Sequence, residues 1–186
     1  MTDLQIISLY WQRSEDAIAA SSAAYGGYCR TIAQNILHNA EDSEECVSDT
    51  WLNAWNTMPP QRPQRLRAFF GRITRNLALN RWKQEHTAKR GGGQTAAALT
   101  ELEECIPAAD GAVQAVEDAE LARVLQQFLL AQPEPKRTVF LCRYWYLTPV
   151  KQIAQRCGMS ESKVTAILYR MRQRLKKTLE QEGIAL

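Results

Sequence analysis

The stretch PVKQIAQRCGMSESKVTAILYRMRQRLKK, Pro149 to Lys177, decides how this chain folds, because it reads as two helices joined by a very short turn. Gly158 suits the left-handed conformation of such a turn, and Ser160 suits the N-cap of the helix that follows. Apolar residues at helical spacing give each helix one inner face: Ile153, Ala154 and Cys157 on the first, and Val164, Ile167, Leu168, Met171 and Leu175 on the second. The pattern predicts a helix-turn-helix.

The outer face of the second helix is polar and basic. The whole stretch holds eight Lys or Arg residues against one acid, Glu161. A polar first turn suits base edges in DNA, and cations further along the helix suit phosphates. We therefore expect DNA contacts from Ser160, Glu161, Ser162, Lys163, Thr165, Arg170 and Arg174. A purely structural helical hairpin would show the same apolar spacing and remains the alternative.

The rest of the chain predicts an all-α protein of two small domains. Its 186 residues, 45% of them hydrophobic, suffice for one ordinary domain or two small ones. Apolar residues recur at helical spacing, with no sustained period-two alternation, and KRGGGQTAAALTELEECIPAADG interrupts them. We expect helical domains over residues 1–90 and 119–182, joined by a flexible acidic linker over residues 91–118.

Charge is distributed unevenly along the chain, although the net charge is only +3. From Gln61 to Arg90 there are nine Lys or Arg residues and one acid, whereas Leu99 to Glu120 holds seven acids and no base. Each expected domain therefore has its own basic element, which suits a polyanion contacted at two points. In the free protein we expect the acidic linker, Glu101 to Glu120, to cover one or both basic faces.

No cofactor, metal or catalytic site is indicated. The five cysteines are scattered without a CxxC pair, His38 and His86 lack a matched acid or nucleophile, and the GGG at 91–93 lacks the GK[ST] of a phosphate loop. The first residues do not resemble a signal peptide, and no apolar run approaches the length of a membrane span. We expect a cytoplasmic protein with reduced thiols that is not an enzyme and has no membrane partner.

Two pairs of motifs carry a family resemblance. QIAQRCGMSESKV with YRMRQRLKK resembles region 4 of the sigma-70 family of transcription initiation factors, and DSEECVSDTWLNAW with RAFFGRITRNLALNRWKQ is similar to region 2. The order, with two regions and a linker, resembles the extracytoplasmic-function (ECF) group. The resemblance implies binding to bacterial core RNA polymerase, reading of the −35 element as duplex by region 4, and opening and single-strand reading of the −10 element by region 2. It also raises an anti-sigma protein as a further candidate partner.

In ITRNLALNRWK, Asn76 and Asn80 lie four residues apart, so they project from one side of a helix. Amides can bond to exposed base edges while cations hold the backbone, and Trp82 offers a stacking face unless it is packed against the core. The expected −10 contacts are Arg72, Arg75, Asn76, Asn80, Arg81, Trp82 and Lys83. In the family, the loop corresponding to Asn56–Arg67 captures a −10 base.

The resemblance places the polymerase contact on the acidic helix that precedes this loop. Aromatic and acidic residues together suit a protein interface better than DNA. The expected contacts are Glu45, Asp49, Trp51, Leu52 and Trp55, although the tryptophans would serve equally as core. A free-standing helix-turn-helix regulator with an N-terminal interaction domain is the alternative function.

Overall fold

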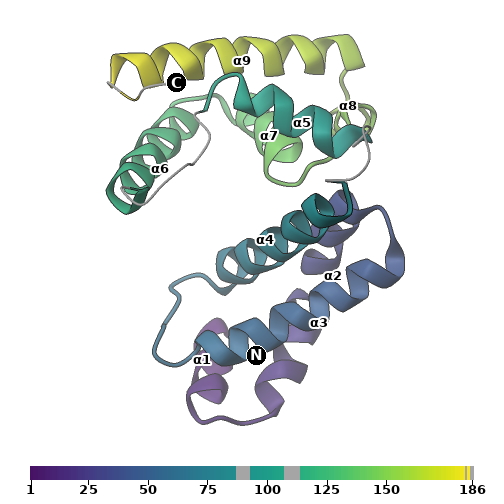
Figure 1. The fold of residues 1–186 in the computed structure, drawn as a ribbon, viewed down its shortest axis with the longest axis vertical. Coiled ribbons are helices and arrows are strands. Elements are labelled where there is room, and N and C mark those ends of the chain that lie inside the picture. The colour runs from purple at the N-terminus through teal and green to yellow at the C-terminus, as the bar shows by residue number, and fades with distance from the viewer. Residues whose placement is uncertain (87–92, 107–113, 183, 185–186) are drawn as a thin grey trace. The chain divides into compact units, whose positions relative to one another are not determined.

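The computed structural model describes residues 1–86, 93–106, 114–182 and 184, and these residues form helices without any strand (Figure 1). The chain divides into two compact units, Met1–Gly91 and Gly92–Leu186. The first holds α1 (Asp3–Trp11), α2 (Asp16–Leu37), α3 (Ala40–Thr57) and α4 (Leu66–His86). The second holds α5 (Gly93–Glu103), α6 (Gln114–Leu130), α7 (Glu134–Tyr144), α8 (Val150–Cys157) and α9 (Glu161–Gln181). The prediction of an all-α fold with two helical domains is confirmed.

In the first unit, α2, α3 and α4 pack against one another (Figure 1). An aromatic cluster lies between these helices. Phe70 of α4 is fully buried, and its ring centroid lies 5.2 Å from that of Trp51 and 5.4 Å from that of Tyr25. One turn further along α4, the Thr74 hydroxyl lies 3.0 Å from the Thr50 hydroxyl, and both are buried. This pair satisfies two hydroxyls that would otherwise cost free energy in the interior. These contacts determine which side of α4 faces the core.

In the second unit, α8 and α9 form the predicted helix-turn-helix. Gly158 ends α8 with a φ of +61°, and the Ser160 side chain accepts a hydrogen bond from the Lys163 amide at 3.2 Å. The turn chemistry read from the sequence is therefore present. The inner faces meet α7 in one core, whose buried members include Val139, Phe140, Ile153, Val164, Leu168, Met171 and Leu175.

The helix α5 occupies part of the segment for which we expected a flexible linker. Its residues pack on the second unit, where Cys105, just after the helix, is 2% exposed and Leu102 lies against the core. A periodic signal was present, because Ala98, Leu102 and Cys105 follow helical spacing. The glycines before this segment and the proline after it favoured the interpretation of the segment as a linker. Residues 87–92 and 107–113 of the expected linker lie outside the described part of the chain.

No helix in the described ranges is both long enough and apolar enough to span a lipid bilayer.

The close approach of α2 and α4 at Gly71 generates a stability prediction. A methyl group at Gly71 would collide with the Tyr28 hydroxyl and lie 3.0 Å from Cε1 of its ring, whereas one at Gly27 meets nothing. Both glycines lie inside helices, where alanine is intrinsically better by about 1 kcal/mol. We expect Gly27→Ala to raise the thermal unfolding midpoint and Gly71→Ala to lower it, as followed by circular dichroism.

The Tyr28→Ala background separates the clash from other causes. In that background the collision partner is gone, so Gly71→Ala should become neutral or stabilising. If Gly71→Ala costs the same stability with and without the Tyr28 ring, the packing described for this contact is incorrect.

Candidate nucleic-acid interfaces

The outer face of α4 presents the predicted asparagines. Phe70, Thr74 and Ala78 are buried beneath the helix, while Arg72, Asn76 and Asn80 are exposed on successive turns. Lys83 continues the exposed row near the end of the helix. Two amides flanked by two cations thus share one accessible side, an arrangement that suits an unpaired base and its phosphates. The structure brings these four predicted residues together.

Arg81 is held by acids of the same unit. Its Nη2 atom lies 2.7 Å from Glu45 Oε2 and 2.9 Å from Asp42 Oδ1, and its Nε atom lies 3.6 Å from Glu85 Oε1. The hydrogen bond to Glu45 is the main cause that raises the pKa of Arg81 above its ordinary value. A phosphate would have to compete with these carboxylates. The structure therefore separates Arg81 from the exposed row, although the sequence placed it there.

Arg75 and Trp82 are half-buried, unlike the exposed row. Burial lowers the pKa of the Arg75 guanidinium, since the charged form loses hydration. The sequence left open whether the Trp82 ring is buried or exposed, and its actual position is intermediate. Only part of each side chain is therefore accessible to nucleic acid.

The loop between α3 and α4 is tied to the N-terminal helix, which sequence reasoning missed. The Trp11 indole N–H donates to the Gln61 carbonyl at 3.4 Å, and the Arg62 guanidinium lies 4.1 Å from the centroid of the Trp11 ring. Next to this contact, Arg13, which follows α1, donates to the carbonyl of Trp55 in the last turn of α3 at 2.6 Å. At the far end of the loop, the Leu66 amide donates to the Asp3 carboxylate at 3.4 Å. No local pattern could reveal these contacts, because they join residues more than forty positions apart.

The acidic helix α3 exposes only part of the predicted polymerase contact. Glu45 and Asp49 are exposed, and Leu52 stands out with 57% of its surface accessible. Trp51, by contrast, is 6% exposed and meets Phe70 edge-on. The inclusion of Trp51 in an outward contact surface is therefore wrong, because its ring fills the core. Trp55 is half-buried beside Arg13.

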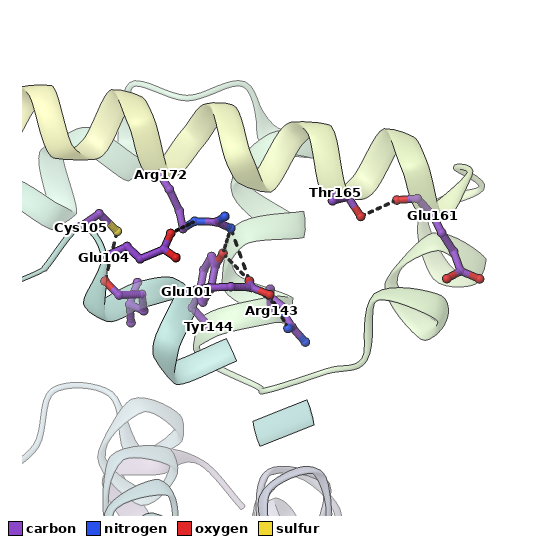
Figure 2. Close-up of polar contacts among 9 residues, drawn as sticks. Glu101, Glu104, Cys105, Arg143, Tyr144, Glu161, Thr165 and Arg172 are labelled. Carbon is purple, nitrogen blue, oxygen red and sulfur yellow. Dashed lines mark hydrogen bonds and ion pairs between the residues drawn. The ribbon is translucent and has the colours of Figure 1, made fainter. Parts of the chain in front are cut away.

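The N-terminal half of α9 exposes the residues predicted to read DNA. Glu161, Ser162 and Lys163 lie in the exposed first turn, and the Thr165 hydroxyl donates to the Glu161 carbonyl at 3.0 Å (Figure 2). Because Ser160 caps the helix, its hydroxyl is already engaged. Arg170 and Arg174 are exposed further along. All seven predicted residues thus lie on the accessible side of α9.

Tyr169 was missed as a candidate contact residue. It is 56% exposed, four residues after Thr165, and lines a groove of about 300 Å³ together with Lys136, Arg170 and Arg174. Its position outside the apolar stripe was visible in the sequence. An exposed aromatic ring between cations suits a base edge or a sugar.

Within the described ranges, no group of three or more His, Cys, Asp or Glu side chains could hold a metal ion.

Comparison with known families identifies both units. The family model for sigma-70 region 2 matches residues 23–87, and the one for sigma-70 region 4 matches residues 122–175. Together the matched segments cover more than half of the chain, in the order expected from the motifs. No curated protein matches the chain. The helix α1 and the helix α5 lie outside both matches.

The contrast between an exposed and a paired arginine on α4 can be tested with single-stranded DNA. Arg72→Ala should weaken binding of a fluorescent oligonucleotide and lower the slope of log affinity against log salt by about 0.7, the value for one phosphate contact. Arg81→Ala should instead lower the thermal midpoint, since it leaves three acids without their cation. If Arg81→Ala weakens oligonucleotide binding as much as Arg72→Ala while leaving stability unchanged, the ion pairs do not occupy Arg81.

Proposed function

Since the chain belongs to the sigma-70 family, with the region 2 and region 4 combination typical of the ECF group, we propose that the exposed faces of α4 and α9 read the −10 and −35 elements. The protein is a transcription initiation factor, and its two regions bind core RNA polymerase and the two promoter elements. The comparisons lend no support to the alternative of a free-standing regulator. These regions belong to families that are not enzymes, and sigma factors act in the cytoplasm with RNA polymerase.

The observation that carries the −10 assignment is the exposed row of Arg72, Asn76, Asn80 and Lys83 on α4. Duplex DNA in the −10 element must be opened before amides can reach the Watson–Crick edges of its bases. Exposed amides can then replace part of the pairing that the bases lose, while the flanking cations hold the displaced backbone. Arg75 and Trp82 are half-buried and have a secondary position in this proposal. Arg81 has none, because carboxylates of the same unit hold its guanidinium.

The loop between α3 and α4 deepens this assignment. In the proposal it captures a flipped −10 base. Its contacts with Trp11 and Asp3, and the bond from Arg13 to the end of α3, order it before DNA binds. A loop ordered in advance loses less conformational entropy on binding. The helix α1 is therefore proposed as a support for −10 reading.

The −35 assignment depends on the N-terminal half of α9. The Gly158 turn joins α8 to α9, and α8 packs against α9. The first turns of α9 are therefore accessible in the way that a DNA-reading helix-turn-helix requires. Ser162, Lys163 and Thr165 are proposed to reach base edges, with Tyr169 beside them, and Arg170 and Arg174 to contact phosphates. Ser160 and Glu161 begin the same exposed turn.

The polymerase contact is proposed for the exposed side of α3, formed by Glu45, Asp49 and Leu52. A solvent-exposed leucine on the same helix as exposed carboxylates suits a protein interface with an apolar centre and a charged rim. Carboxylates on this helix would repel DNA, which separates the two binding faces of the first unit. Trp55, half-buried, can contribute only its accessible edge.

The amides of α4 generate a prediction about strand opening. The double change Asn76→Ala and Asn80→Ala should leave polymerase binding intact and abolish promoter opening, measured as permanganate reactivity of unpaired thymines. Gln126→Ala, an exposed amide on α6, is the control and should leave opening unchanged. Normal opening by the double variant would remove the role assigned to the two asparagines.

The α3 surface generates a prediction about polymerase affinity. Asp49→Lys and Leu52→Ala should each weaken binding to core polymerase by about tenfold, the scale of a truncated interface anchor. Both side chains are exposed, so the circular dichroism spectrum should not change. Ala24→Lys, which adds a lysine to the exposed side of α2, should have no effect. Unaltered affinity in both α3 variants would place the polymerase contact on another surface.

A further inference from the structure

The helix α5 belongs to the second unit, although the match to region 4 begins only at residue 122. Thr95 and Ala98 are buried on its inner side. Leu102 packs on the core of the unit, as do Cys105 and Ile106 just after the helix. The helix also contacts α7 directly (Figure 1). The unit proposed to read the −35 element therefore contains a helix that lies outside the family segment.

One carboxylate, Glu101, joins α5 to both α7 and α9 (Figure 2). Its oxygens accept hydrogen bonds from Arg143 of α7, from Nη2 at 2.7 Å and from Nε at 3.3 Å, and from the Tyr144 hydroxyl at 2.9 Å. Arg172 of α9 donates through Nη1 to Glu101 at 3.4 Å and to the Tyr144 hydroxyl at 2.7 Å. We call these four side chains the Glu101 network. The carboxylate comes from outside the region 4 match, whereas its three partners lie inside it.

Glu101 neutralises two guanidinium groups that are shielded from solvent. Only 5% of the Arg143 side chain and 13% of the Arg172 side chain are exposed. Glu104 lies 3.9 Å from Nε of Arg172, but its side chain is 62% exposed, so solvent screens this pair. Burial raises the pKa of Glu101, but the contacts with arginine and tyrosine outweigh this effect, and the pKa is lowered. Glu101 is therefore the ionised partner on which both buried cations depend.

The position of Arg172 depends on this network. Its Nε atom is buried and makes no hydrogen bond, so its hydrogen bonds to α5 and α7 are made through Nη1. Removal of one partner of a buried ion pair leaves an uncompensated charge. Without the Glu101 carboxylate, the guanidinium groups of Arg143 and Arg172 would repel each other across the Tyr144 hydroxyl. The contact between α9 and α7 would then loosen at this point.

Arg172 lies in the part of α9 that carries the proposed phosphate contacts. Arg170 and Arg174 flank it in the sequence and are exposed, whereas Arg172 points toward α5 and α7 (Figure 2). Glu101 and Glu104 pair with the inward arginine and leave the two outward ones exposed. The expectation that acids of the predicted linker cover the basic faces therefore gains no support from these pairs.

Directional contacts hold α9 at two points. At its start, the Gly158 turn and the Ser160 cap fix the first turn. About 18 Å further along the helix, at 1.5 Å per residue, the Glu101 network holds Arg172. The apolar packing between these points is non-directional, whereas charge-assisted hydrogen bonds add geometric specificity. The direction of the helix that carries the proposed base contacts is therefore fixed at both points.

We propose that Glu101 is a positioning residue for reading of the −35 element: it holds Arg172 from α5 and thereby sets where the outer face of α9 meets DNA. The inference rests on the proposed function of α9. Hydrogen bonds to base edges tolerate little displacement, and these contacts carry the sequence information. Phosphate contacts carry none, and long arginine side chains can follow a displaced phosphate. The effect of Glu101 therefore lies in sequence discrimination rather than in affinity for any DNA.

Discrimination is measured with holoenzyme and a promoter fragment that wild-type holoenzyme selects from random DNA. The readout is the ratio of the dissociation constant for the same fragment with a scrambled −35 element to that for the selected fragment. Glu101→Gln should lower this ratio by about fivefold. Affinity for the scrambled fragment should not change, because Arg170 and Arg174 remain exposed. Glu103→Gln makes the same charge change at an exposed acid of α5 and should leave the ratio unaltered.

Val124→Ala separates positioning from stability. Val124 is 2% exposed and lies on α6, which contributes no side chain to the Glu101 network. Its truncation should lower the thermal unfolding midpoint, because it leaves a cavity in the core. With every variant measured well below its own midpoint, Val124→Ala should keep the wild-type ratio. A merely structural role of Glu101 predicts instead that Glu101→Gln and Val124→Ala behave alike.

Arg172→Met provides a second route to the same test if Glu101→Gln impairs folding. It removes the cation from α9, while Arg143 and Tyr144 still bind Glu101. Arg172→Met should lower the ratio as Glu101→Gln does. The double variant should lower it no further, because both changes remove the same contact.

Three results would overturn the proposal. They are a wild-type ratio in Glu101→Gln or in Arg172→Met, an equal loss in Val124→Ala, and effects of Glu101→Gln and Arg172→Met that add in the double variant. A ratio of one for the wild-type protein would show that α9 does not read the −35 element, and the inference would fail together with that proposed function. A wild-type ratio well above one that the Glu101 variant retains would instead remove the role of Glu101 alone.

Discussion

The packing of Phe70 against Trp51 and Tyr25 is the constraint on which the first unit depends. It directs one side of α4 into the core, and the neighbouring Thr50–Thr74 hydroxyl pair keeps that side in register. The opposite side, with Asn76 and Asn80, is then necessarily exposed. A helix of this kind has little freedom to rotate, because a shift of one residue would bury an arginine and expose a phenylalanine. The surface proposed to read the −10 element is thus a consequence of core packing.

Ion pairs, rather than the net charge, distinguish the arginines that are available to DNA from those that are not. Arg72 is exposed on the row with the asparagines, whereas Arg81 lies among three carboxylates and Arg143 and Arg172 are held by Glu101. A cation held in an ion pair is not available to a phosphate, although a count of basic residues would include it among the DNA contacts. The number of basic residues in a segment therefore overstates how many of them face a phosphate. In the second unit, the pairing has a different consequence, since it fixes a helix that belongs to the connecting segment.

Local chemistry in the sequence predicted much of this arrangement. The Gly158 turn, the Ser160 cap, the end of α3 before the paired prolines and the exposed side of α4 all follow from periodicity and turn preferences. The features that escaped prediction are contacts between distant residues: Trp11 with the α3–α4 loop, Arg13 with the end of α3, Arg81 with α3, and Glu101 with α7 and α9. Trp51 was ambiguous because a tryptophan in an amphipathic helix serves a core or an interface equally well. Only the packing around Phe70 separates these two positions.

The central claim is that this chain is an initiation factor for core RNA polymerase, and in vitro transcription tests it most directly. Core polymerase would be incubated with a library of DNA fragments with and without the protein, and the 5′ ends of the transcripts would be mapped. The account predicts transcripts that start at defined positions only when the protein is present, downstream of shared −10 and −35 sequences in one fixed polarity. Transcript ends that are the same with and without the protein would contradict it, as would a protein that binds palindromic duplex DNA and leaves initiation unchanged.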